Sequence, residues 1–351
     1  MYSRIAQIIL GIIGFFFILY VGQEILIPVV FAILIAILLN PIVNFLCSKK
    51  INRIISIVIA ILFLTIVFGA LGFFIITQVG QFSDTFPLFK EKFSILTNDI
   101  LHWAADTFKI SEPRIKEWIS KSQKNIDGMM VLEGVMGTLK GMLAVFVMPV
   151  LIFIVLYYKP LFLEFIMELF EKREQGVVSE VFTETKSLIQ QYLVGLSIEA
   201  IIVAVLNCAG LLILGIPYAI LLGVLSALLN VIPYIGILSA SALTILIAMT
   251  MKSAGAGLSV FILFLIVQFI DNQYILPKIV AGKVQVNPLF SIVVVFAGGA
   301  LWGIPGMFLA IPLTAIVKVI FDRVDSLKPF GLLLGDTIPG QAKSTGKSSK
   351  K

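Results

Sequence analysis

Two carboxylates inside apolar runs are the residues best suited to carry a proton or bind a solute. Glu199 is the only charged residue between Lys186 and Lys252, and burying an ionisable group in a membrane costs at least about 2.5 kcal/mol. Asp271 lies in the polar stretch QFIDNQYILPK, residues 268–278. Both are candidate coupling residues. The alternative for Glu199 is that it lies near one end of its run and extends to the surface.

The polar stretch 268–278 places several oxygen and amide groups together. Gln268, Asp271 and Asn272 are spaced three and four residues apart, so they share one face of a helix. Such a face can hydrogen-bond a polyol or coordinate a small cation through oxygen ligands. The alternative is that these groups hold neighbouring membrane helices together.

Helix-breaking residues interrupt two other apolar runs, at NVIPYIG (230–236) and at GIPG (303–306). Each freed backbone group in hydrocarbon costs several kcal/mol, so such backbone must be buried in protein or line a wet cavity. We expect both sets to form the turns of re-entrant helical hairpins that meet a solute. The predicted path residues are Asn230, Pro233, Tyr234, Gly236, Gln268, Asp271, Asn272, Gly303, Pro305 and Gly306.

Catalytic and cofactor motifs are not found in the sequence. There is no HExxH and no nucleophile elbow, and Cys47, Cys208 and His102 have no ligand-like spacing. The tail stretch GQAKSTGKS (340–348) has five residues where a Walker loop has four. We expect no catalytic residue, no metal and no cofactor.

The composition indicates a polytopic membrane protein of all-α class. Of 351 residues, 59% are hydrophobic and 13% are charged, with a mean hydropathy of +1.08, whereas a soluble domain carries about 25% charged residues. The net charge of +6 gathers at Lys49, Lys50 and Arg53 and in the tail 343–351. Positive-inside placement explains it without a nucleic-acid partner.

About six runs are long enough to span a membrane. The basic loop at 49–53 is expected in the cytoplasm, which puts the segment after the third span outside and the tail inside. The predicted full spans are Ile5–Val21, Ile25–Leu46, Ile54–Thr77, Gly141–Tyr158, Leu193–Leu214 and Gly257–Leu276.

These elements divide the chain into seven parts. The divisions are 1–80 (three spans), 81–140 (an extracytoplasmic amphipathic helical segment), 141–158 (the fourth span), 159–192 (a cytoplasmic amphipathic helix region), 193–256 (a span plus the first hairpin), 257–328 (a span plus the second hairpin) and 329–351 (a basic cytoplasmic tail).

The outer segment carries a heptad pattern of apolar residues, spaced alternately four and three apart. The pattern predicts an amphipathic helix that packs on its own protein or on lipid; association between subunits is the alternative. Its members are Phe82, Phe86, Phe89, Phe93, Leu96, Ile100 and Trp103.

The two hairpins are arranged as an inverted repeat. Pro217 and Pro233 are 16 residues apart, Pro288 and Pro305 are 17 apart, and each pair follows one full span. The intervening span 257–276 turns the second hairpin to face the opposite side, as in many secondary transporters. Chance spacing of prolines is the alternative.

Three blocks in order resemble one known family: GIPYAILLGVLSALLNVIPYIG, QFIDNQYILPKIVAGKVQVNPL and GGALWGIPGMFLAIPLTAIVKVI. The chain resembles the autoinducer-2 exporter-like family, also called PerM-like permeases, over nearly its whole length. The resemblance implies a multi-pass permease of the bacterial inner membrane, in contact with membrane lipid and forming a homo-oligomer. One departure is Asn287, where relatives often place His, which puts proton coupling by that route in doubt.

The leading hypothesis is a permease or exporter of a small polar solute, autoinducer-2-like in chemistry. The alternative is a sodium or lithium–proton antiporter, in which Asp271 or Glu199 alternates between proton and monovalent cation. A third hypothesis is a non-transporting oligomeric scaffold, for which deleting residues 82–103 would abolish activity. Cation-dependent pH changes in vesicles distinguish the first two.

Overall fold

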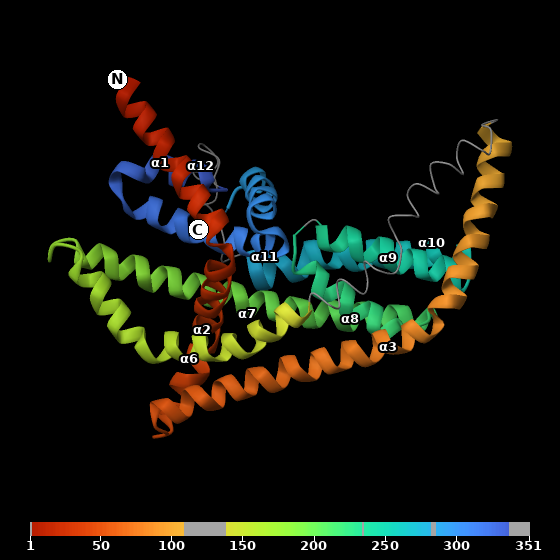
Figure 1. Cartoon of the computed structure of the whole chain (residues 1–351), viewed down its shortest axis with the longest axis horizontal. Coiled ribbons are helices and arrows are strands. Elements are labelled where there is room, and N and C mark those ends of the chain that lie inside the picture. The colour runs from red at the N-terminus through yellow and green to blue at the C-terminus, as the bar shows by residue number, and fades with distance from the viewer. Residues whose placement is uncertain (1, 109–137, 234, 282–285, 337–351) are drawn as a thin grey trace, which may run out of the picture.

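The computed structural model describes residues 2–108, 138–233, 235–281 and 286–336, and every regular element in these ranges is helical. The predicted all-α class is therefore confirmed (Figure 1). Tyr234 and most of the second half of the outer segment lie outside the described residues. The elements are α1 (Tyr2–Val21), α2 (Gln23–Ser48), α3 (Arg53–Phe108), α6 (Thr138–Glu168), α7 (Gln175–Ile213), α8 (Ala219–Asn230), α9 (Ile235–Met251), α10 (Ala254–Ile270), the π-helices η1 (Asp271–Ile275) and η2 (Pro277–Ala281), α11 (Pro288–Arg323), the 3-10 helix η3 (Asp325–Leu327) and α12 (Lys328–Leu334).

Six helices of the described chain are long and apolar enough to cross a membrane. Five coincide with predicted spans, and the sixth is α11, which contains the predicted second hairpin. The predicted first span corresponds to α1, whose apolar stretch Ile9–Val21 is shorter than the others. Large side chains such as Phe16, Phe63 and Leu265 are more than half exposed, at 52%, 56% and 54%. Apolar exposure on this scale needs lipid to cover it.

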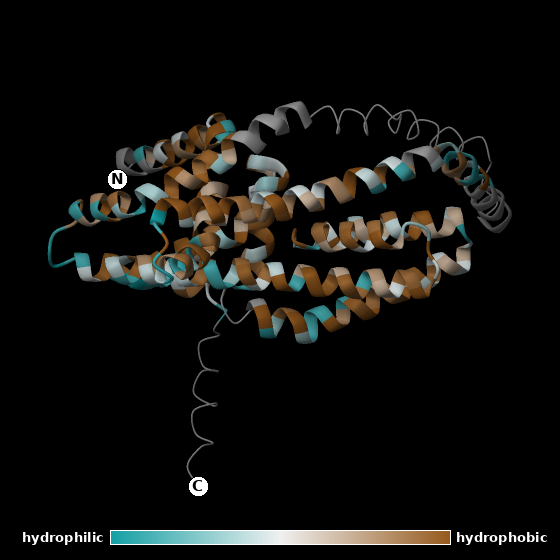
Figure 2. Cartoon of the chain, turned by 90° about the horizontal axis from the view of Figure 1, so that it is seen from below, coloured by the Kyte–Doolittle hydropathy of each residue, from teal (hydrophilic) through white to brown (hydrophobic). Residues whose placement is uncertain are grey.

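Two helices are longer than the predicted spans within them. α3 continues from its span into the outer segment, contains Pro87, and changes direction in its second half (Figure 1), a bend that we attribute to this proline. α7 joins part of the amphipathic region to the following span in one helix of 39 residues. Figure 2 shows hydrophobic residues along most helices and hydrophilic residues gathered at the turn between α6 and α7.

The first hairpin packs against α7 (Figure 1). A turn with positive φ at Gly215 and Tyr218 ends α7 and reverses the chain into α8. α8 then lies so close to α7 that a Cβ on Gly223 would be 2.7 Å from the backbone nitrogen of Cys208. α8 ends at Asn230, α9 begins at Ile235 and returns along α8, and α10 packs on α9.

The predicted second hairpin falls within α11, a single long helix with a kink. Its backbone is non-helical at Trp302 and Gly303, where Gly303 has φ of 62°. A Cβ on Gly306 would be 2.0 Å from the carbonyl oxygen of Gly298, so the two arms touch through their backbones. The first hairpin has the same arrangement, because a Cβ on Gly236 would lie 1.6 Å from the carbonyl oxygen of Leu229. In each hairpin only glycine fits there.

Candidate functional site

The turn of the first hairpin contacts the end of α10. Asn230, the last residue of α8, donates from Nδ2 to Oδ2 of Asp271 at 3.3 Å. Asp271 opens η1, and Pro277 opens η2. Proline lacks the N–H that an α-helix needs, and π-helical turns inside helices are frequent at functional sites. The structure therefore brings together one residue from each of two predicted polar sets.

Glu199 of α7 lies beside this pair. It is 5% exposed, Asp271 is 3% exposed, and the negative charge of Asp271 acts on the Glu199 carboxyl group. Glu199 Oε2 and Asp271 Oδ1 have no hydrogen-bond partner among the described residues. A buried polar atom left unpaired costs about 1–3 kcal/mol. Two such carboxylates near a hairpin turn form a centre that a donor group of a solute would stabilise.

Asn207 is a further buried polar residue on the same side of α7 as Glu199, and it is not among the residues predicted from the sequence. It lies eight residues after Glu199 on α7, has no exposed surface, and neither Oδ1 nor Nδ2 finds a partner in the described chain. Residues spaced by four and eight lie on one face of a helix. The signal was present, because Asn207 is the only amide side chain between Glu199 and Pro217.

The turn of the second hairpin contacts the same helix nearer its N-terminus. Trp302 is buried with Tyr192 and Leu193 of α7, and its Nε1 donates to the carbonyl oxygen of Leu19 at 2.9 Å. Tyr192 is seven residues before Glu199, a rise of about 10 Å along a helix. Of the predicted residues here, Gly306 is buried, Pro305 is half-buried and Gly303 is exposed.

Gln268 and Asn272 hydrogen-bond to each other and not to Asp271 or Asn230 in the described residues. Gln268 Nε2 donates to Asn272 Oδ1 at 3.1 Å, and Asn272 is exposed on this chain. Asp271 is buried toward Asn230 instead. In the first hairpin, Pro233 is half-buried and Gly236 is buried against Leu229.

Asn287, where the resemblance led us to expect His, has a local role. Its Oδ1 accepts a hydrogen bond from the backbone nitrogen of Leu289 at 2.9 Å and caps α11. Its backbone nitrogen donates to the carbonyl oxygen of Leu334 at 2.7 Å. An Asn cap of this kind stabilises a helix start by about 1 kcal/mol. The residue therefore has a structural function at the start of the second hairpin.

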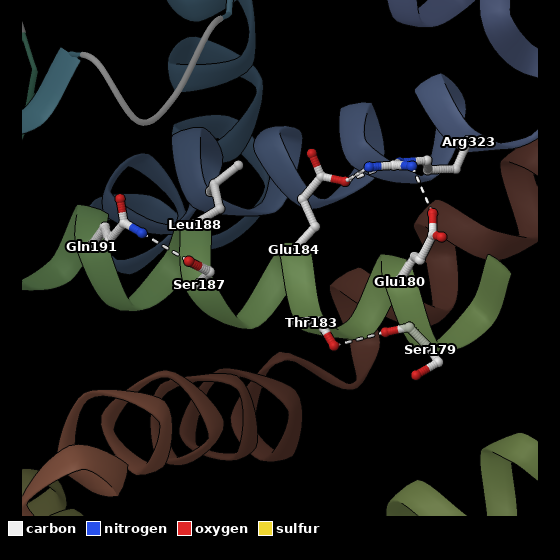
Figure 3. A pocket seen from close by; sticks show the side chains of 8 residues that line it. All are labelled: Ser179, Glu180, Thr183, Glu184, Ser187, Leu188, Gln191 and Arg323. Atoms are coloured by element: carbon white, nitrogen blue, oxygen red, sulfur yellow. Dashed lines mark hydrogen bonds and ion pairs between the residues drawn. The ribbon is translucent and has the colours of Figure 1, made fainter. Parts of the chain in front are cut away.

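A polar pocket of about 640 Å³ lies along the N-terminal half of α7. Arg323, the last residue of α11, donates to Glu184 at 2.7 Å and to Glu180 at 2.7 Å across it (Figure 3). Gln191 lines its other end, next in sequence to Tyr192. Gln191 is exposed and Tyr192 is buried, so the two side chains lie on different sides of α7. Its lining residues are Ser179, Glu180, Thr183, Glu184, Ser187, Leu188, Gln191 and Arg323.

The assembled groups suit hydrogen bonding more than metal binding. Within the described residues, no three His, Cys, Asp or Glu side chains come together as a metal site. Carboxylates accept hydrogen bonds, and carboxamides both donate and accept. Along α7, such groups occur at the pocket, at Glu199 and at Asn207.

Comparison with known proteins identifies the family of the chain. Residues 8–326 match the sequence profile described as AI-2E family transporter. YrrI of Bacillus subtilis (strain 168) is 29% identical over 309 residues, which cover 85% of this chain and 86% of YrrI. YueF of the same strain is 26% identical over 309 residues, covering 85% of this chain and 83% of YueF. PerM of Escherichia coli (strain K12) is 28% identical over 190 residues, which are 53% of this chain and 54% of PerM.

The names of these relatives class YrrI and YueF as transport proteins and PerM as a permease, each provisionally. The resemblance carried by the three sequence blocks is thereby confirmed. Because the matched residues extend from within α1 to just beyond α11, the chain belongs to the AI-2E family of transporters.

Proposed function

We propose that this transporter carries a small, neutral, polar solute, autoinducer-2-like in its density of hydroxyl groups, across the bacterial inner membrane. The observation that carries the proposal is the hydrogen bond from Asn230 to Asp271 beside Glu199. It joins a hairpin turn to the end of α10 and leaves Glu199 Oε2 and Asp271 Oδ1 without partners among the described residues.

The solute passes along α7 in three steps. It enters the pocket that ends at Gln191 and passes the second hairpin turn at Tyr192 and Trp302. Its hydration water is then replaced by the carboxylate oxygens of Glu199 and Asp271 and by the amide of Asn230. In the last step the solute hydrogen-bonds to the amide of Asn207. Turns of broken helices bind solutes in this way in many secondary transporters.

A polyhydroxylated neutral solute matches these groups. Hydroxyl groups can donate to the unpaired carboxylate oxygens, and they can both donate to and accept from the Asn207 amide. A site built for hydrogen bonds rejects analogues that lack the hydroxyl group, because its buried polar groups are then left unpaired.

The outer part of α3 assembles the protein in this proposal. Phe82 and Phe89 pack against the cluster around Tyr218 on the same chain, whereas Phe86 is 39% exposed. The exposed side of this seam is available for association between subunits of a homo-oligomer. Deleting residues 82–103 would then weaken assembly. Transport by the shortened subunits would support a carrier, and complete loss of activity would support a scaffold.

The test is solute flux into proteoliposomes with Asn207→Leu beside the wild type. Small polyols and furanones are the solutes, and Asn44→Leu, an exposed residue of α2, is the matched control. Losing hydrogen bonds to a buried amide costs about 1–3 kcal/mol, so we expect flux to fall about tenfold or more. Equal flux in Asn207→Leu and the wild type would remove Asn207 from the path.

A pH-sensitive dye in the same vesicles addresses the antiporter alternative. Under an imposed proton gradient, a neutral-solute carrier gives no signal when sodium or lithium is added. A cation-dependent signal that disappears in Asp271→Asn would contradict the neutral-solute proposal. It would show that the protein transports a monovalent cation and that Asp271 is the coupling carboxylate.

A further inference from the structure

Three cations from three helices meet at the end of the molecule formed by the α2–α3 turn and α6. Arg53 donates from Nη2 to the carbonyl oxygen of Leu156 at 2.9 Å. Lys159 donates from Nζ to Oδ1 of Asn40 at 2.9 Å. Leu156 and Lys159 are three residues apart, so both cations are anchored to the same turn of α6. Lys186 of α7 and Arg53 both repel the Lys159 ammonium group electrostatically.

The partners of these cations are neutral. Within the described part of the chain, no carboxylate forms an ion pair with Arg53, Lys159 or Lys186. Arg323 differs, because its guanidinium group is held by two carboxylates. Like charges repel each other, and Lys159 and Lys186 are both half-buried, so water screens them incompletely. An anion in contact with all three would stabilise the arrangement.

We propose that Arg53, Lys159 and Lys186 bind the phosphate group of an anionic phospholipid in the cytoplasmic leaflet. A guanidinium group presents paired N–H donors to phosphate oxygens, and an ammonium group supplies further donors. Arg53 and Lys159 each donate one hydrogen bond to a neutral group, which leaves their other donors for the phosphate. Basic pockets between membrane helices on the cytoplasmic side are suited to anionic headgroups.

The surroundings of the cluster favour a lipid over free phosphate. Tyr157 and Tyr158 precede Lys159 and are 41% and 46% exposed, and amphipathic rings of this kind suit the level of lipid headgroups. Ile54 and Ile55 follow Arg53 and are 45% and 54% exposed. An acyl chain can therefore cover apolar side chains while the headgroup contacts the cations.

The test measures lipid binding to the purified full-length chain in neutral detergent by native mass spectrometry. The probes are phosphatidylglycerol, zwitterionic phosphatidylcholine and inorganic phosphate. We expect the wild type to retain phosphatidylglycerol and to bind it at least tenfold more tightly than phosphatidylcholine. Lys159→Gln keeps a donor for Asn40 but removes the charge, and it should lose most of this preference.

Two further variants make the result decisive. Lys186→Gln should weaken phosphatidylglycerol binding as Lys159→Gln does, whereas Lys172→Gln, an exposed cation at the α6–α7 turn, should leave it unchanged. Equal binding by the wild type and both cluster variants would overturn the proposal. An equal loss of phosphatidylglycerol binding in Lys172→Gln would show that the binding depends on general surface charge and not on this cluster. Displacement of the lipid by millimolar inorganic phosphate would show that the cluster binds free phosphate and not a lipid headgroup.

Discussion

The proposed contact with a solute depends on single residues of α7. Glu199 and Asn207 share one face with Val203, which packs with Ala227 and Val267. Apolar contacts therefore hold the face in place, while the polar atoms of Glu199 and Asn207 remain unpaired among the described groups. A buried amide without partners would destabilise the helix bundle. Its presence is consistent with binding of water or solute.

The sequence could reveal the charged residues of the candidate site but not their partners. Glu199 and Asp271 stand out because charge is rare in apolar runs. Asn207 is neutral and lies inside an ordinary span, so it is marked only as the one amide there and by its eight-residue spacing from Glu199. Helical spacing placed Asp271 with Gln268 and Asn272, but packing directs Asp271 toward Asn230 and leaves Asn272 exposed. Contacts between distant segments decide this.

The glycine after each hairpin turn gives a prediction at the same scale. A Cβ on Gly236 would lie 1.6 Å from the carbonyl oxygen of Leu229, which forces the backbone to move. Overpacking of this kind costs about 1–3 kcal/mol, so Gly236→Ala should lower the thermal unfolding midpoint in detergent. Gly72→Ala is the control, since a Cβ there meets nothing within 4 Å. Equal midpoints for both variants would show that the hairpin turn tolerates a side chain.

At the scale of elements, a buried aromatic side chain and a pair of exposed ion pairs both connect α11 to α7. Trp302 is part of the backbone break, is 9% exposed, and links α1 to the cluster on α7. The ion pairs from Arg323 to Glu180 and Glu184 also connect α11 with α7, but their side chains are about half exposed, at 41%, 64% and 45%. Exposed ion pairs contribute only about 0–1 kcal/mol.

These magnitudes predict unequal effects of substitution. Trp302→Ala should destabilise the protein by about 3–5 kcal/mol, because it removes a large buried side chain. Trp302→Phe retains most of the packing and should lose about 1 kcal/mol with the hydrogen bond to Leu19. Arg323→Gln should cost less than either. Unfolding in detergent measures all three, and a larger loss in Arg323→Gln than in Trp302→Ala would show that the ion pairs hold α11.

Helix-breaking residues predicted where elements change direction, but not how. Pro233 and Gly236 marked the first turn, and the structure separates α8 from α9 there. Gly303 and Pro305 marked the second, where the break lies at Trp302 and Gly303 inside one long helix. The π-helical turns after Asp271 had only Pro277 as a signal. Proline shows that hydrogen bonding is interrupted, whereas neighbouring helices decide which helical form replaces it.

For the whole molecule, hydropathy predicted the class and most spans, because long apolar segments need lipid whatever their packing. It did not predict how far helices extend beyond the membrane. α3 contains 56 residues, and part of its outer half packs beside the α7–α8 turn, where Thr85 hydrogen-bonds to Tyr218. Contacts of this kind depend on side chains more than 100 residues apart in sequence.

The arrangement of the two hairpins predicts opposite accessibility at their ends. If the first hairpin enters from outside and the second from the cytoplasm, Ala254 at the start of α10 faces outside and Ser326 beyond α11 faces the cytoplasm. Both positions are exposed, so a cysteine placed there can react. Cys47 and Cys208 are free thiols that would also react, so Cys47 is first replaced by serine and Cys208 by alanine.

In this background, a membrane-impermeant maleimide should label Ala254→Cys in intact spheroplasts. It should label Ser326→Cys only after the membrane is opened. Tails rich in Lys and Arg remain in the cytoplasm, which fixes the expected side of Ser326. Since α10 and α11 separate the two positions, labelling of both from outside would mean that α11 crosses the membrane fully, as its length alone permits. The second hairpin would then be a kinked span, and the broken backbone at Trp302 and Gly303 would line the path within a crossing helix.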